Sequence, residues 1–144
     1  MQKGAKQLNL AWLALRIGLG LCPIIAGVDK YFNLLTDWTA YLNPLATKLL
    51  PVSAVTFMHV IGVVEIVAGA IVLTRWTRLG SYVVAAWLVG IALNLLSMGK
   101  FFDVAVRDLG LAVAAFALSQ LTAVREQTHA FVASSGEEPI PVRA

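Results

Sequence analysis

Apolar residues occupy four long stretches of the chain, and shorter polar or aromatic segments separate them. Each stretch has about 20 residues, the length that an α-helix needs to cross the hydrocarbon core of a bilayer. The four predicted spans cover about 8–28, 53–74, 78–97 and 104–123. Short connections make the last three antiparallel neighbours, so the pattern predicts an all-α fold, an integral membrane four-helix bundle.

The composition supports a membrane protein. Of the 144 residues, 59% are hydrophobic and 13% charged, and the mean hydropathy is +0.80, whereas soluble domains average roughly 45–50% apolar and 25% charged residues. The net charge is +3, but the basic residues flank apolar stretches and form no cluster, so we expect no nucleic-acid partner. The single cysteine, Cys22, excludes an intrachain disulfide and a CxxC redox pair.

The connections predict an orientation in the bilayer. Lysines and arginines are more numerous at the N-terminus, in the second connection and in the C-terminal segment than on the opposite side, which predicts cytoplasmic termini. Residues 125–144 are polar, and we expect a disordered cytoplasmic tail there.

The longest connection, 31–51, mixes aromatic and turn residues, which favours short interfacial helices; a lid over an outward-facing pocket is the alternative. We expect the first span to be retained and not cleaved as a signal peptide, because Arg16 interrupts it.

Glu65 lies in the middle of the second predicted span, in the stretch VIGVVEIVAGAIVL. A charge at the centre of a bilayer costs about 2.5 to 3.5 kcal/mol, so it needs a partner or a task. Arg16 in the first span lies at a similar predicted depth, roughly 12 Å from the cytoplasmic end against roughly 13 Å for Glu65. Glycines accompany both charges at helical spacings and favour close backbone approach: Gly20 and Gly27 in the first span, Gly62 and Gly69 in the second. We therefore predict an intramembrane Arg16–Glu65 ion pair. Its predicted role is structural, to fix the register of the two helices, and proton handling is the alternative.

A second set of polar residues is predicted to lie at one depth near the outer surface and to receive a ligand such as a quinone. Its members come from all four spans: Lys30, His59, Asn94, Arg107 and Asp108. Simpler interpretations stand beside this one, since Asp108 suits the start of a helix, Arg107 can reach the interface, and His59 can be a satisfied interior histidine. No second histidine and no cysteine is predicted to lie near His59, so no metal site is expected.

Span four also carries a stripe of small and polar residues at helical spacing. The stripe consists of Asp108, Ala112, Ala115, Ser119 and Thr122. Such residues allow helices to pack closely in lipid, so this face is predicted to turn toward the other helices.

The segment RIGLGLCPIIAGVDK resembles the opening signature of the DoxX family of small membrane proteins. The residues that carry this likeness are Arg16, Gly20, Gly27 and Lys30. The glycines on either side of Glu65 and the segment VRDLGLAVAAFAL in span four extend it to about Thr122. The resemblance singles out Arg16, Lys30 and Glu65, whereas His59 and Asn94 belong to the predicted ligand set only because of their predicted depth.

The resemblance implies a four-helix protein of the cytoplasmic membrane of a bacterium or archaeon. It also implies an association with quinone-linked oxidoreductases, among them thiosulfate:quinone oxidoreductase. The implied role is that of a membrane subunit or anchor of such a redox complex, with sulfur metabolism as one option. The sequence has no cysteine set, no paired haem-ligand histidines and no dinucleotide-binding glycine motif, so the chain is not expected to be an enzyme alone or to hold an intrinsic cofactor.

Three functions follow from these observations. In the first, the outer polar set receives a quinone headgroup while a partner protein supplies the electrons. In the second, the intramembrane charges belong to a small-solute carrier or a component of such a pathway. In the third, the chain is a purely structural assembly subunit. Its expected contacts are the lipid bilayer and either a redox partner or further copies of itself.

Overall fold

The computed structural model describes residues 2–49 and 51–135, and every element in this part of the chain is a helix. The elements are α1 (Gln2–Asp29), the 3₁₀-helix η1 (Trp38–Tyr41), α2 (Pro44–Leu49), α3 (Ala54–Leu73), α4 (Thr77–Ser97) and α5 (Phe102–Ser135). Helices α1, α3, α4 and α5 are long and apolar enough to cross a membrane. The predicted all-α bundle with four candidate spans is therefore confirmed, and the long connection contains short helices, as expected.

Local signals explain where the helices begin and end. The Ser53 side chain caps α3 by accepting a hydrogen bond from the Thr56 backbone N–H at 3.1 Å. After α3, the Thr74 hydroxyl donates to the Ile71 carbonyl at 2.7 Å and satisfies a backbone acceptor of the last turn. The tight turn between α4 and α5 uses Gly99 at φ +65°, a left-handed conformation that glycine adopts without steric cost.

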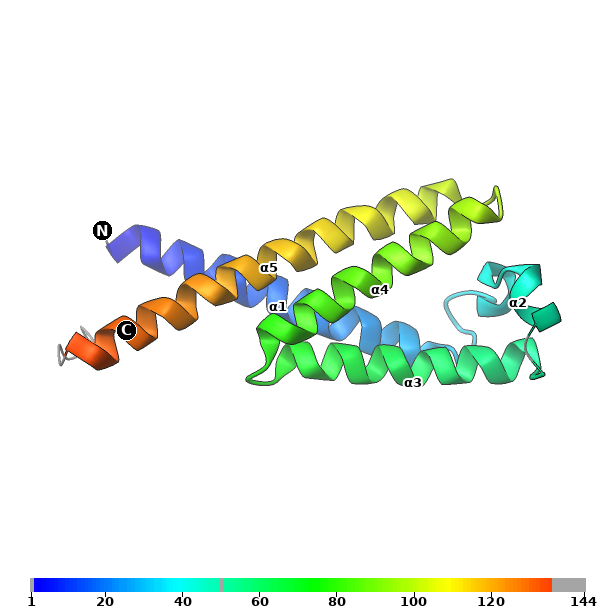
Figure 1. Cartoon of the computed structure of the whole chain (residues 1–144), viewed down its shortest axis with the longest axis horizontal. Coiled ribbons are helices and arrows are strands. Elements are labelled where there is room, and N and C mark those ends of the chain that lie inside the picture. Colours follow the sequence, from blue (N-terminus) through cyan, green and yellow to red (C-terminus); the bar gives the residue numbers. More distant parts are fainter. Residues whose placement is uncertain (1, 50, 136–144) are drawn as a thin grey trace.

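The four long helices form two antiparallel pairs, α1 with α3 and α4 with α5, and the pairs lie across each other (Figure 1). The start of α1 and the end of α5 lie at the same end of the molecule, where both helices extend past the short α3–α4 turn (Figure 1). The segment with η1 and α2 lies at the opposite end (Figure 1).

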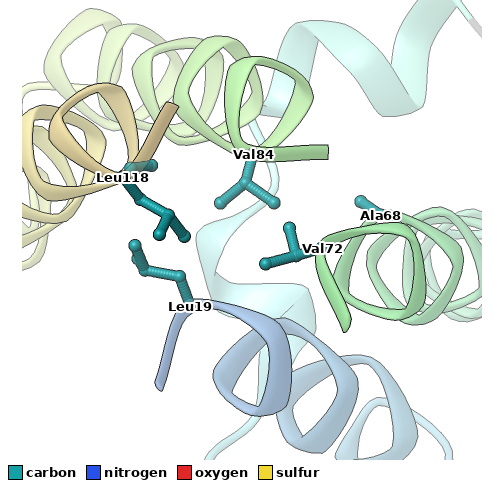
Figure 2. Close-up of a cluster of buried hydrophobic side chains, with 6 residues drawn as sticks. Leu19, Ala68, Val72, Val84 and Leu118 are labelled. Atoms are coloured by element: carbon teal, nitrogen blue, oxygen red, sulfur yellow. The ribbon is translucent and has the colours of Figure 1, made fainter. Parts of the chain in front are cut away.

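The core is small and draws on all four long helices. Leu19 of α1, Ala68 and Val72 of α3, Val84 of α4 and Leu118 of α5 converge in Figure 2. Many larger apolar side chains instead lie on the outside of the bundle. This distribution suits a bilayer, because lipid tails solvate large apolar groups while small residues allow helices to approach each other.

The small and polar stripe predicted on span four faces the interior of the bundle, as expected. Asp108, Ala112, Ala115, Ser119 and Thr122 are all buried.

Glycines bring α1 and α3 into direct backbone contact. A Cβ atom added at Gly27 would lie 2.5 Å from the Gly62 carbonyl oxygen, and one added at Gly62 would lie 2.6 Å from the Gly27 carbonyl oxygen. Two turns away, a Cβ atom added at Gly69 would overlap the Gly20 carbonyl oxygen, and one added at Gly20 would meet the Leu73 side chain at 2.5 Å and the Gly69 carbonyl oxygen at 3.3 Å. The predicted close approach at these glycines is present, and it aligns the two helices along their length.

Helix α5 continues past the predicted end of the fourth span. Residues 125–135 are helical, so the prediction of a disordered tail starting at 125 was wrong for them. The segment AVREQTHAFVASS contains no proline or glycine and is rich in residues that tolerate helix, which allows the helix to continue beyond the apolar stretch. The remainder of the predicted tail, 136–144, lies outside the described residues.

Candidate functional site

A buried ion pair occupies the interior of the bundle. The Lys30 Nζ lies 2.5 Å from the Glu65 Oε2, and the two side chains are 3% and 7% exposed. Glu65 is in the middle of α3, about 12 Å from its C-terminal end. Lys30 directly follows α1. The two charges therefore neutralise each other where neither has access to water.

The indole of Trp38, in η1, covers this pair. The Lys30 Nζ lies 3.7 Å from the centre of the Trp38 ring, which is a cation–π geometry. The Trp38 Nε1 donates to the Asp29 Oδ2 at 2.8 Å. The same carboxylate accepts the backbone N–H groups of Leu34 and Leu35, each at 3.0 Å. Asp29 thus stabilises the turn after α1 and orients the ring that lies on Lys30.

Helices α4 and α5 complete the surroundings of the pair. The Trp87 Nε1, on α4, is directed at the Glu65 Oε1 with a long separation of 3.5 Å. Asp108, on α5, is buried and is close enough to interact electrostatically with both Lys30 and Glu65. The site, defined as Lys30, Glu65, Trp38, Trp87 and Asp108, takes one residue from each of α3, η1, α4 and α5, and one from the end of α1.

The predicted Arg16–Glu65 ion pair is not formed, and that prediction was wrong. Arg16 instead binds the backbone at the end of α3. Its Nε donates to the Val72 carbonyl at 3.2 Å, and its Nη2 donates to the carbonyls of Leu73 and Thr74 at 2.5 and 3.0 Å. A helix C-terminus has unsatisfied carbonyls and a partial negative charge, and the guanidinium of Arg16 compensates both.

The register of α1 against α3 explains the error. The contacts Gly20–Gly69 and Gly27–Gly62 place Arg16 level with the last residues of α3, about two turns beyond Glu65. Helix α1 begins near Gln2, well before the apolar stretch, so depth counted from the first apolar residue misplaced Arg16. The same register brings Lys30 next to Gly62, one turn from Glu65.

The other residues of the predicted ligand set are only partly brought together. Lys30 and Asp108 belong to the site. The ring of His59 stacks on that of Tyr31, with 4.5 Å between the ring centres. The Asn94 Nδ2 donates to the Tyr41 carbonyl at 2.9 Å and so fixes the end of η1. The Arg107 side chain is 67% exposed, and its Nε lies 3.6 Å from the Asp108 Oδ1.

An apolar groove runs along the outside of α1 beside the site. Its volume is about 370 Å³, and its lining comes from Ile24, Ile25, Val28, Asp29, Phe32, Leu34 and Leu35. Asp29 is the one ionisable residue of this lining. Because Asp29 also binds Trp38, the groove and the buried ion pair have a common boundary.

Sequence reasoning did not predict the roles of Asp29, Trp38 and Trp87. Asp29 next to Lys30 at the end of a span was visible, but no sequence pattern linked the two tryptophans to Lys30 or Glu65. A tryptophan eight residues after a buried lysine follows no helical or strand periodicity that would connect the two, because a turn separates them. Only the path of the turn between α1 and η1 brings the ring onto the ammonium.

This arrangement can bind a polar group within the membrane. Lys30 supplies N–H donors, Glu65 and Asp108 supply carboxylates that can accept or release a proton, and Trp38 and Trp87 supply flat apolar faces. Among the described residues, no three His, Cys, Asp or Glu side chains are grouped closely enough to hold a metal ion.

Comparison with known proteins gives one match. The DoxX family model matches residues 11–97, which include most of α1 and all of η1, α2, α3 and α4. The segment VRDLGLAVAAFAL in α5 lies outside the matched residues. No match was found among curated proteins or among solved structures. The matched region covers more than half of the chain and contains Arg16, Lys30, Trp38, Glu65 and Trp87, and the chain therefore belongs to the DoxX family of multi-span membrane proteins.

Proposed function

We propose that this chain is a membrane subunit of a quinone-linked redox complex and that it holds a quinone headgroup at the Lys30–Glu65 pair. The observation that carries the proposal is the position of this pair. An ammonium and a carboxylate are buried together in the interior of the bundle, with an indole ring lying on the ammonium. Charged groups inside a membrane bundle commonly mark ligand or proton pathways.

The chemistry of the pair suits a quinone. A quinone carbonyl accepts hydrogen bonds, and the oxygen becomes strongly basic when electrons arrive. The Lys30 ammonium has three N–H donors, of which Glu65 uses one and the Trp38 face covers another direction. A carbonyl placed at the remaining donor would be polarised. Glu65 lies 2.5 Å from the Lys30 Nζ, so once it has taken up a proton it could reprotonate Lys30 after Lys30 has donated to the reduced ring. The buried carboxyl of Asp108 is a second group able to hold a proton.

The surroundings of the pair support the same ligand class. The groove beside Asp29 is apolar, and its volume of about 370 Å³ is enough for part of an isoprenoid chain, which a membrane quinone carries and a soluble substrate does not. The two indoles can pack against a flat headgroup. Electrons would come from a partner protein, since Cys22 is the only cysteine of the chain and no cofactor motif is present in its sequence.

Tryptophan fluorescence can test the proposal, because quinones quench nearby indoles. The purified protein in neutral detergent is titrated with a short-chain ubiquinone or menaquinone analogue. We expect saturable quenching that weakens at least tenfold in apparent affinity in Lys30→Met and stays unchanged in Lys100→Met, whose lysine lies on the exposed α4–α5 turn. Linear, non-saturating quenching, or equal quenching in the two variants, would refute the quinone site.

The quenched residues can be identified in the same experiment. Trp38→Phe and Trp87→Phe should each remove part of the saturable quenching, whereas Trp76→Phe at the α3–α4 turn should not. If only Trp76→Phe reduces the quenching, the quinone binds at the other end of the bundle and the proposed position is wrong.

A purely structural role for the pair is the second candidate, and one observation favours it. No buried polar side-chain atom in the described part of the chain lacks a hydrogen-bond partner, so the site is already satisfied without a ligand. In that case the double variant Lys30→Met with Glu65→Met would fold, and it would assemble with its partner proteins and support their activity as the unmodified chain does. Under the quinone proposal the same variant would assemble but lose quinone reduction.

We also propose that the end of the molecule with both termini faces the cytoplasm of a bacterial or archaeal cell. The support is the excess of lysine and arginine at this end. A reporter enzyme that is active only in the cytoplasm, fused after Ala144, should be active. A fusion that is active only with an exported reporter would reverse the orientation.

A further inference from the structure

A basic hollow lies at the end of the bundle where α3 turns into α4, far from the ion pair. Its volume is about 230 Å³. The residues that determine its chemistry are Trp12 and Arg16 of α1, Arg75 of the α3–α4 turn, and Arg125 and Glu126 of α5. Three segments far apart in the sequence therefore direct arginines into one small space.

The ring of Trp12 holds two of these arginines. Its Nε1 donates to the Thr122 Oγ1 at 2.9 Å, which fixes the ring between α1 and α5. The Arg125 Cζ lies 4.2 Å from the ring centre, and the Arg16 Cζ lies 5.0 Å from it. Two guanidinium groups on one indole repel each other unless a negative charge lies nearby.

The described residues around the hollow do not supply enough negative charge to balance these arginines. Glu126 is the one acidic side chain of the lining, and its Oε2 lies 3.6 Å from the Arg78 Nη1, so it is already engaged by a fourth arginine. Arg16 is bound to backbone carbonyls, which carry only partial charge. The described contact of Arg75 is a distant one with the ring of Trp76, at 6.0 Å. Arg125 donates from its Nη1 to the Asn9 Oδ1, which is a neutral acceptor. The hollow therefore keeps an excess of positive charge, and its guanidinium groups have further N–H donors for an oxyanion.

The position of the hollow indicates which oxyanion it meets. It lies where the apolar helix α3 ends, at Leu73, and this is the level at which a bilayer changes from hydrocarbon to headgroups. Tryptophans such as Trp12 and Trp76 prefer the same level. The phosphate diesters of lipid headgroups are concentrated there, and guanidinium groups bind phosphate oxygens through pairs of N–H donors.

We propose that this hollow binds the phosphate of an anionic phospholipid headgroup. The phosphate would lie between Arg75 and Arg125, with Arg16 behind it, and the acyl chains would follow the apolar outer surface of the bundle. The proposal does not depend on the quinone site, because no residue is common to the two.

Native mass spectrometry of the protein released from neutral detergent can test it. The full chain is titrated with phosphatidylglycerol and, separately, with phosphatidylcholine of the same acyl chains. We expect discrete adducts with phosphatidylglycerol at concentrations at least tenfold below those needed for phosphatidylcholine. A juxtamembrane arginine contributes about 1 kcal/mol to anionic lipid binding, which corresponds to about fivefold in affinity. Arg75→Gln and Arg125→Gln should therefore each weaken phosphatidylglycerol binding about fivefold.

Two further variants make the result specific. Lys100→Gln removes one positive charge at the opposite end of the bundle and should leave phosphatidylglycerol binding unchanged. Glu126→Gln removes the opposing charge and releases Arg78, so it should strengthen binding severalfold. Arg16 is left intact in this test, because it also satisfies the end of α3.

The proposal is overturned if the two lipids bind equally, if Lys100→Gln weakens binding as much as Arg75→Gln does, or if Glu126→Gln has no effect. It is also overturned in favour of a soluble ligand if millimolar inorganic phosphate displaces the lipid adducts and itself gives adducts that the arginine variants lose.

Discussion

Replacing Lys30 with methionine would leave the Glu65 carboxylate in the bundle interior without its counter-charge. In the folded protein the two charged atoms are 2.5 Å apart, and both side chains are almost fully buried. Removal of one partner from a buried ion pair costs about 3 to 5 kcal/mol, because the remaining charge has lost water without compensation. Lys30→Met also removes the contact with the Trp38 ring, worth about 0.5 to 2 kcal/mol. We expect a total loss of about 5 kcal/mol, near the middle of the combined range of about 3.5 to 7 kcal/mol.

Replacing both residues should cost much less than the two single changes together. Methionine fills a volume similar to either side chain, and substitution of a whole buried ion pair by apolar residues is often nearly neutral. The double variant Lys30→Met with Glu65→Met should therefore be more stable than the sum of the single variants by at least about 3 kcal/mol. In a bilayer the recovery is favoured further, because the surroundings solvate apolar side chains and not charges.

The free energy of unfolding can be measured by titrating the protein in mixed micelles with a denaturing detergent and following its helicity by circular dichroism. Lys100→Met is the matched control, since it removes an exposed lysine on the α4–α5 turn, and it should change the free energy by less than about 0.5 kcal/mol. A coupling energy between Lys30 and Glu65 below about 0.5 kcal/mol would refute the reasoning, because the two charges would then not depend on each other.

Two other predictions concern the contact between α1 and α3. Gly69→Ala should destabilise the bundle by about 1 to 3 kcal/mol in the same unfolding assay, because the new methyl group would overlap the Gly20 carbonyl oxygen. Gly90→Ala is the control: its methyl group has free space, so the change should be nearly neutral. Equal effects of the two changes would contradict the glycine contact. Arg16→Gln should increase hydrogen exchange of the backbone amides in the α3–α4 turn, because the guanidinium binds the carbonyls at the end of α3. The amides of α3 around Glu65 should stay protected. Increased exchange around Glu65 alone would instead favour a direct link between Arg16 and that carboxylate.

The amino-acid sequence was sufficient to predict the class of fold. The length and continuous apolarity of four stretches determine that they form helices in a bilayer, because a segment of about 20 residues there can satisfy its backbone N–H and C=O groups by itself only as a helix, whereas the strands of a β-barrel are about half as long. The glycines at 20, 27, 62 and 69 indicated where α1 and α3 touch, and the spacing on span four indicated which face turns inward. These features depend on residue type and on the spacing of residues along a helix, and both can be read from the sequence without knowledge of the packing.

The sequence also indicated that Glu65 needs a partner, but only the tertiary structure decided which one. Arg16 and Lys30 are both basic residues on the first span, and they lie about four turns apart on it. A choice between them requires the register of α1 against α3, which the glycine contacts set to within one turn. Counting from the apparent start of an apolar stretch cannot supply that register, because α1 begins well before the stretch does.

The position of Trp38 over the ion pair depends even more on tertiary structure, and so does the existence of the basic hollow. Trp38 reaches Lys30 because the turn held by Asp29 directs the chain back over the end of the bundle. The hollow exists because α1, the α3–α4 turn and an α5 longer than its apolar stretch meet at one level. Such sites arise from contacts between distant segments, and neither hydropathy nor spacing records them; their energies depend on distances of a few ångströms that only the packed chain defines.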